Sequence, residues 1–302
     1  MSHILTSLWP LFFLILAGYG LERAGFPGTG FWPGAERFNY YILFPALLFI
    51  SLGSAPLDHP ALPRLFVAIA LILAIATAGL FAARRFRRWP AARFGVLLQG
   101  SLRFNTYLGL AAVGGLYGRE GMLFAAVILA VLVPAVNVLS VLALSMDDGG
   151  HPWARVVRVA KNPLILACLA GVVANLAGIE LKWGSDRLLQ MLANTSLPLG
   201  LLSVGAALKP SELRGQGAAL VGNSLIRLLV MPVLAFASAR LLALPVVETA
   251  ILVLFFALPV APTSYVLTRQ LGGDGHLMAG IITCQTLLSA ASLLLVVAAL
   301  AR

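Results

Sequence analysis

Long apolar stretches separated by short polar links run along the whole of this chain. A helix that spans the hydrocarbon core of a bilayer needs about 20 mostly apolar residues. The pattern therefore predicts membrane-spanning helices rather than a soluble domain. We expect ten spans, at residues 4–21, 37–54, 65–83, 94–116, 121–145, 162–179, 187–208, 217–241, 247–268 and 276–300.

The composition supports this interpretation. The chain is 60% hydrophobic and 11% charged, and its mean hydropathy is +0.96, whereas a soluble domain usually carries about 25% charged residues. A net charge of +10 would suggest nucleic-acid binding in a soluble protein. Here most Lys and Arg residues lie between the apolar stretches, where they indicate membrane topology instead.

The two halves of the chain resemble each other. Residues 9–26 (WPLFFLILAGYGLERAGF) and 162–179 (NPLILACLAGVVANLAGI) are identical at seven of 18 positions. Apolar composition alone would supply matched Leu and Ala, but not a matched proline and two matched glycines. The sequence thus predicts an internal repeat. The identical pairs are Pro10/Pro163, Leu11/Leu164, Leu16/Leu169, Ala17/Ala170, Gly18/Gly171, Ala24/Ala177 and Gly25/Gly178.

Each copy of this repeat would hold five spans. Because five is odd, the second copy enters the membrane from the opposite side, which is the inverted-topology repeat of secondary transporters. We predict a first repeat at 1–145, a cytoplasmic connecting loop at 146–161 and a second, inverted repeat at 162–302.

The distribution of Lys and Arg predicts the orientation. The links after the odd-numbered spans carry thirteen of these residues and the opposite side six, with the cluster RRFRR at 84–88 dominating. Cytoplasmic links carry the excess of positive charge. Both termini are therefore expected on the outer, periplasmic face of an inner membrane.

The ninth predicted span contains two prolines in its middle, in FALPVAPTSY (256–265). Pro259 and Pro262 lack an N–H group and would free the carbonyls of Phe255 and Leu258. Such a break is tolerated where protein or a water-filled cavity covers it. We favour a discontinuous helix here, and an ordinary proline kink is the alternative.

Two new half-helices would begin after the interruptions. In the ninth span, Thr263 and Ser264 are suitable N-cap residues. The fourth span has no proline but a polar run, QGSLRFNTYLGL (99–110), in which Asn105 or Thr106 could cap a half-helix. Two half-helix N-termini that meet near the midplane would suit an anionic group such as a carboxylate.

Two arginines are predicted inside spans. A charge at mid-span costs about 3 kcal/mol on insertion scales, so Arg103 in the fourth span is a candidate for binding substrate charge or for gating. The alternatives are that Arg103 caps carbonyls of a broken neighbour or snorkels toward the membrane surface. For Arg227, in the eighth span, we favour a structural role.

Amide side chains also occur deep in the spans, among them Asn137 in the fifth and Gln285 in the tenth. Each could line a cavity or form an interhelical hydrogen bond, which is usually worth under about 1 kcal/mol. All eleven Asp and Glu residues lie at span ends or in links, which argues against a cation exchanger with a buried carboxylate. Because HExxH, GxSxG and Cys/His clusters are absent from the sequence, we expect no enzyme, metal site or cofactor.

Several of these segments, in this order, resemble the auxin efflux carrier family, which includes plant PIN-type auxin exporters and bacterial homologues. The similar segments are PLFFLILAGYGLERAGF, FNYYILFPALLF, SLRFNTYLGL followed by LYGREG, VPAVNVLSV and ALPVAPTSYVLTRQLGGD. The resemblance implies an all-α membrane fold of two inverted five-helix repeats, with broken helices crossing in spans four and nine. It further implies a scaffold of spans one, two, six and seven, a transport domain that moves against it, and homodimerisation.

The resemblance also implies a substrate site beside the crossover, at Asn105, Pro259 and Pro262 with Asn137 nearby. Family substrates are small organic anions, auxin in plants and dicarboxylates such as malate or malonate in bacteria. The chain departs from the family in lacking a proline in the fourth-span crossover, which predicts a less sharp break there. It also lacks the long hydrophilic loop of plant long-form members.

We therefore interpret the chain as a secondary carrier that moves a small organic anion by alternating access. Its predicted partners are that anion, the bilayer and a second copy of the chain, with sodium or a proton left open as coupling ion and no nucleic acid. The alternatives are a sodium-coupled bile-acid-type symporter and a non-transporting receptor on the same fold. The candidate substrate-binding residues are Arg103, Asn105, Thr106, Asn137, Pro259, Pro262, Thr263, Ser264 and Gln285.

Overall fold

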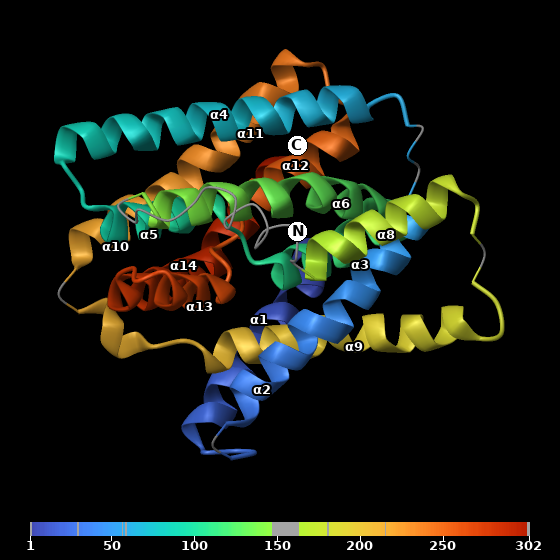
Figure 1. The fold of residues 1–302 in the computed structure, drawn as a ribbon, viewed down its shortest axis with the longest axis horizontal. Coiled ribbons are helices and arrows are strands. Elements are labelled where there is room, and N and C mark those ends of the chain that lie inside the picture. Colours follow the sequence, from blue (N-terminus) through green and yellow to red (C-terminus); the bar gives the residue numbers. More distant parts are fainter. Residues whose placement is uncertain are drawn as a thin grey trace. The chain divides into compact units, whose positions relative to one another are not determined.

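The computed structural model describes residues 2–28, 30–55, 57, 59–146, 163–179, 181–214 and 216–300. The described residues form helices and connecting turns, with no β-strand among them. Apart from Met146, the predicted connecting loop 146–161 lies outside the described residues. The helices and helical turns, in chain order (Figure 1), are α1 (Ser2–Arg23), α2 (Phe31–Phe38), η1 (Asn39–Leu43), α3 (Phe44–Gly53), α4 (Leu62–Arg87), α5 (Ala91–Leu102), α6 (Thr106–Leu144), α8 (Pro163–Leu176), α9 (Ser185–Ala206), η2 (Pro210–Leu213), α10 (Gly217–Leu225), η3 (Ile226–Val230), α11 (Met231–Leu241), α12 (Val246–Ala257), α13 (Thr263–Gln270) and α14 (Gly275–Leu300).

Six segments of the described chain are long and apolar enough to cross a membrane. They are Ile4–Arg23, Leu62–Arg87, Ala91–Leu144, Ser185–Ala206, Gly217–Leu241 and Gly275–Leu300. Two shorter helices, Pro163–Leu176 and Val246–Ala257, are also apolar. The described part of the chain is therefore all-helical with several membrane-capable helices, as expected, whereas the number of ten spans and their inversion stay predictions.

The predicted fourth and fifth spans are joined within α6. Its backbone leaves the helical region at Gly118, with φ 59° and ψ −149°, inside the link that the sequence predicts there. Glycine adopts this conformation without the steric penalty that a Cβ atom would bring.

The chain divides into two compact units. Unit 1 consists of Met1–His59, Leu110–Pro134 and Val157–Ala207, and unit 2 of Pro60–Gly109, Ala135–Val156 and Leu208–Arg302. The predicted spans one, two, six and seven, which the resemblance assigns to a scaffold, lie in unit 1 apart from Leu208 at the end of the seventh. Unit 1 also contains Leu110–Pro134, which the resemblance leaves outside the scaffold.

Unit 1 is built on close helix packing. Helix α1 packs against α9, and α3 packs against both α8 and α9 (Figure 1). The helices approach at glycines: a Cβ atom on Gly18 would overlap the Leu202 carbonyl, and one on Gly171 would lie 2.8 Å from the Phe49 carbonyl oxygen. Small residues permit such approach between membrane helices. The matched glycines Gly18 and Gly171 therefore both lie at helix contacts.

The other matched glycines end α1 and α8 with the same turn. Gly25 and Gly178 have φ of 71° and 62°. The next N–H donates to the carbonyl five residues earlier, from Phe26 to Leu21 at 3.0 Å and from Ile179 to Ala174 at 2.9 Å. This is the Schellman ending that a left-handed glycine allows.

An interhelical amide contact also stabilises unit 1. The buried Asn39 side chain donates from Nδ2 to the Ser196 carbonyl at 2.9 Å and accepts from the Ser196 hydroxyl at 2.7 Å. Asn194, its counterpart at nearly the same repeat offset, is exposed and accepts from Gln190 at 2.8 Å. Asn39 therefore acts as an interhelical hydrogen-bonding group.

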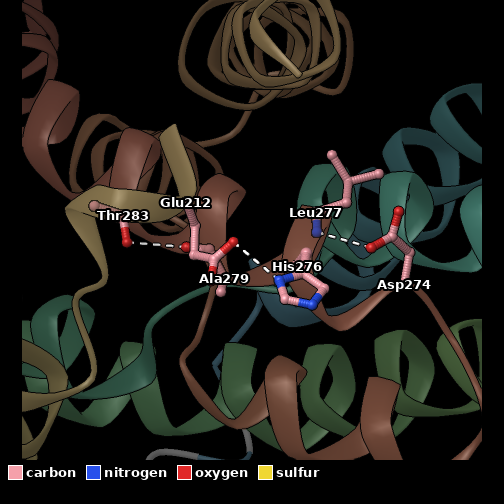
Figure 2. A network of polar contacts seen from close by, with 6 residues as sticks. All are labelled: Glu212, Asp274, His276, Leu277, Ala279 and Thr283. Carbon is pink, nitrogen blue, oxygen red and sulfur yellow. Dashed lines mark hydrogen bonds and ion pairs between the residues drawn. The ribbon is translucent and has the colours of Figure 1, made fainter. Parts of the chain in front are cut away.

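Unit 2 has its own polar contacts at the start of α14 (Figure 2). The Asp274 side chain accepts from the Leu277 N–H at 2.9 Å, and the Thr283 hydroxyl donates to the Ala279 carbonyl at 2.9 Å. The exposed His276 ring lies 3.1 Å from Glu212 of η2. Asp274 thus supplies the cap that the first turn of α14 requires.

Candidate functional site: the two helix interruptions of unit 2

Both predicted interruptions are present. Helix α5 ends at Leu102, Arg103 and Asn105 have extended conformations, and α6 begins at Thr106. Helix α12 ends at Ala257, with an extended Leu258, and α13 begins at Thr263. In the fourth span the backbone leaves the helix without a proline, over residues 103–105, whereas the ninth-span interruption covers 258–262; the less sharp break expected in the fourth span stays a prediction.

The two half-helices that precede the breaks are closely alike. Each of α5 and α12 has 12 residues. Each follows a proline N-cap in an extended conformation, Pro90 or Pro245. A proline costs no hydrogen bond here, because the N–H groups at the start of a helix have no intrahelical partner. Because α5 and α12 both follow a proline and have the same length, the two breaks lie at equivalent points.

The two breaks contact each other. The Asn105 N–H donates to the Pro259 carbonyl at 2.8 Å. The rings of Phe104 and Phe255 meet edge to face, with centroids 5.6 Å apart. Gly109 completes the contact, since a Cβ atom there would lie 2.6 Å from Leu258 Cδ1.

Asn105 caps the half-helix that follows its break. Its Oδ1 accepts from the Leu108 N–H at 3.1 Å, as an N-cap side chain does. Thr106, the alternative cap, is the first residue of α6 and is partly buried. Of the two caps that the sequence left open, the structure selects Asn105.

The predicted capping role of Thr263 or Ser264 is wrong. The residue before α13 is Pro262, with φ −57° and ψ −33°, and no side chain caps the helix. Because the proline ring holds φ near the helical value, the chain already turns at Pro262, which leaves Thr263 and Ser264 inside the first turn. The Thr263 hydroxyl accepts instead from Arg103 Nη2 at 3.1 Å.

The carbonyls freed by the prolines are bound by Arg227. This fully buried guanidinium donates from Nε to the Leu258 carbonyl at 2.6 Å and from Nη2 to the Phe255 carbonyl at 2.7 Å. Its Nη1 reaches the carbonyls of Ser101 at 3.1 Å and Leu102 at 3.5 Å. Arg227 thus satisfies main-chain oxygens at the C-terminal ends of both α5 and α12. The structural role favoured for it agrees with this geometry.

Two buried amides hold the breaks in register. Gln285 of α14 accepts from the Val260 N–H at 2.8 Å and donates to the Gly100 carbonyl and to Asn223 Oδ1, each at 3.0 Å. Asn223 of α10 donates to the Leu97 carbonyl at 2.8 Å. Gln285, a predicted substrate residue, therefore contributes its side chain to the framework of the site.

Buried polar atoms without a protein partner lie beside this framework. Asn105 Nδ2 and Ser264 Oγ are buried and have no hydrogen-bond partner among the described residues. Buried polar groups normally have one, so these atoms can bind a ligand or water. Arg103, 9% exposed, adds a cationic group next to the start of α13.

The predicted residue Asn137 does not join this constellation. It is partly buried in α6 and takes no part in the hydrogen bonds that connect the two breaks.

Sequence reasoning missed Asn223 as a partner of the breaks. The signal was its spacing, since Asn223 and Arg227 are four residues apart and so share a face of a helical segment. Within the described residues, no cluster of His, Cys, Asp and Glu is placed to hold a metal ion.

Comparison with known proteins points to one family. A family model described as "Membrane transport protein" matches residues 153–297. An uncharacterized transporter of Methanothermobacter thermautotrophicus is 28% identical over 282 residues, which cover 93% of each chain. A putative malonate transporter of Rhizobium meliloti is 26% identical over 326 aligned positions, which cover 97% of this chain and 94% of the relative.

Proposed function

Because the chain belongs to the membrane transport protein family, the auxin efflux carrier family, we propose that it is a secondary carrier that moves a small organic anion by alternating access. The family consists of membrane transporters rather than enzymes. The protein is accordingly a multi-pass membrane protein. The substrate, the site and the mechanism described below are our proposals.

The contact between the two breaks carries the proposal. At this point the N-terminal ends of α6 and α13, the Arg103 guanidinium and the unpartnered Asn105 Nδ2 and Ser264 Oγ all belong to one buried region of unit 2. Helix N-termini carry partial positive charge, and their free N–H groups favour anions. A carboxylate bound there would accept hydrogen bonds from donors that the fold already holds in position.

We further propose that the substrate is a short dicarboxylate of the malonate type. The supporting observations are the cationic Arg103 beside two positive helix ends, and the name of one relative, a putative malonate transporter. A second carboxylate would match the additional positive charge. An auxin-like monocarboxylate is the alternative that a competition assay distinguishes.

The ten-span architecture with inverted five-helix repeats is part of the proposal. It is supported by the identical turns at Gly25 and Gly178 and by two half-helices of equal length, α5 and α12. We propose that the termini face the periplasm and that the protein forms a homodimer in the inner membrane. The site would move with unit 2, which contains every described residue of the crossover.

Replacing Asn105 tests the site. In proteoliposomes loaded with malonate, wild-type protein should drive counterflow of labelled malonate, and Asn105→Ala should reduce it to background with unchanged expression. The loss follows because the variant lacks both the cap of α6 and the free Nδ2. Asn194→Ala, which removes an exposed amide of unit 1, serves as the matched control. Wild-type rates from Asn105→Ala would remove the proposed site.

A further inference from the structure

The position of Arg227 bears on the coupling ion. In sodium-coupled carriers with broken helices, unwound backbone carbonyls and the C-terminal ends of half-helices coordinate the ion. In this chain such oxygens, from Phe255, Leu258, Ser101 and Leu102, all accept from the Arg227 guanidinium. A side chain of the protein therefore holds the place that a cation would take.

The electrostatics of the site fit a permanent cation. The ends of α5 and α12 that Arg227 contacts are C-terminal and carry partial negative charge. Within the described part of the chain, Arg227 makes no ion pair with a carboxylate, and its hydrogen bonds go to main-chain oxygens. The helix ends are thus its counter-charge.

Asn223 binds the same half-helix, α5, as Arg227 does. Asn223 precedes it by four residues and donates to the Ser101 hydroxyl at 2.9 Å as well as to the Leu97 carbonyl. A Cβ atom on Gly100 would lie 2.2 Å from Asn223 Oδ1. The absence of a side chain at Gly100 therefore lets the Asn223 amide approach α5 closely.

We propose that Arg227 is a resident cation that takes the place of a coupling sodium ion at the crossover, so that transport does not depend on sodium. The claim about transport rests on the proposed carrier function. The claim that Arg227 occupies a cation position rests only on its contacts with the carbonyls. Arg227 is a positioning residue in this scheme, because it orders the two breaks rather than touching the substrate. Removing it would leave a group of carbonyl oxygens that a small cation can fill.

The first test measures thermal stability in detergent, in sodium chloride and in choline chloride of equal ionic strength. Wild-type protein should have the same midpoint in both salts. Arg227→Ala should unfold about 10 °C lower in choline, because buried acceptors lose their charged donor, and should regain part of this loss in sodium. Arg240→Gln, which removes an exposed arginine of α11, should match wild type in both salts.

Each other result of this test contradicts the proposal. A sodium-specific rise for wild type would show a separate sodium site, and an Arg227→Ala variant equally destabilised in both salts would show that sodium does not substitute for the guanidinium. A variant as stable as wild type would show that the contacts of Arg227 with the carbonyls of α5 and α12 do not stabilise the protein. If Arg227→Ala fails to fold in either salt, Arg227→Lys decides: it retains a cation and should be indifferent to sodium, and a sodium-dependent midpoint would overturn the inference.

The second test measures malonate counterflow of wild-type protein in sodium and in choline. Equal rates are expected, and a loss of uptake in choline would overturn the inference. If malonate is not transported in either salt, the proposed substrate fails, while the stability measurements still decide the role of Arg227.

Discussion

Two buried arginines of unit 2 meet opposite ends of the broken helices. Arg227 donates to carbonyls at the C-terminal ends of α5 and α12, where its charge is compensated. Arg103 instead donates to Thr263 in the first turn of α13, where the helix end is itself positive. Two positive features side by side favour an anion between or beside them, and on this ground we propose that Arg103 binds the substrate, a role different from that of Arg227.

Arg103→Gln should therefore weaken substrate binding more than turnover. Loss of a hydrogen bond to a charged group costs about 1.5–3 kcal/mol, so we expect the KM for malonate to rise roughly tenfold or more with a smaller change in kcat. Concentration series of malonate counterflow measure both quantities. Arg119→Gln, an exposed arginine in α6, is the matched control. An unchanged KM would exclude Arg103 from substrate binding.

At this scale, local chemistry was predictable and partners were not. Proline geometry alone indicated that the carbonyls of Phe255 and Leu258 would be freed, and capping preference indicated Asn105 or Thr106. The donor to those carbonyls, Arg227, comes from a different span, and no local rule specifies which span packs there. Thr263 is not the cap that the sequence predicted because the helical turn already begins at Pro262, and its hydroxyl accepts from a residue of another span, Arg103.

Helix packing in unit 1 depends on the absence of side chains at particular positions of α1. Gly18 lies against the Leu202 carbonyl of α9, whereas a Cβ atom on Gly20, two residues later, would have no neighbouring atom within 4 Å. Gly18→Val should therefore separate α1 from α9 and lower stability by about 1–3 kcal/mol, the usual cost of overpacking. Thermal unfolding in detergent measures the difference.

Gly20→Val provides the comparison on the same helix, since it adds the same side chain where space is open. We expect Gly20→Val to unfold within a few degrees of wild type and Gly18→Val clearly below it. Equal midpoints for the two variants would show that the α1–α9 contact does not determine the stability of unit 1.

Among the elements, one interruption had a clearer signal in the sequence than the other. The prolines of the ninth span marked the break between α12 and α13. The fourth-span break contains no proline. Its non-helical backbone is held by the hydrogen bond from the Asn105 N–H to the Pro259 carbonyl and by the Asn105 side chain, which caps α6. Those contacts exist only in the folded unit.

At the scale of the whole molecule, the internal repeat predicted from 18 aligned positions has two consequences for the structure: a shared turn, and opposite orientations of the two copies in the membrane. The same turn follows α1 and α8, and if the repeats are inverted these identical turns face opposite sides of the membrane. The residues after the two glycines, Phe26 and Ile179, are exposed to nearly the same degree, 60% and 59%. They therefore form a matched pair of reporters.

Cysteine labelling at these two positions tests the inversion directly. In a background carrying Cys168→Ala and Cys284→Ser, which replaces both native cysteines, a membrane-impermeant maleimide added outside intact cells should label Ile179→Cys and leave Phe26→Cys unlabelled. Inside-out vesicles should reverse the pattern, because the arginine-rich side that includes the first turn is expected to be cytoplasmic. Labelling of both residues from the same side would show that the two copies are parallel. The anion site would then lose its physical basis, since the two half-helix N-termini converge from opposite sides of the membrane only when one copy is inverted.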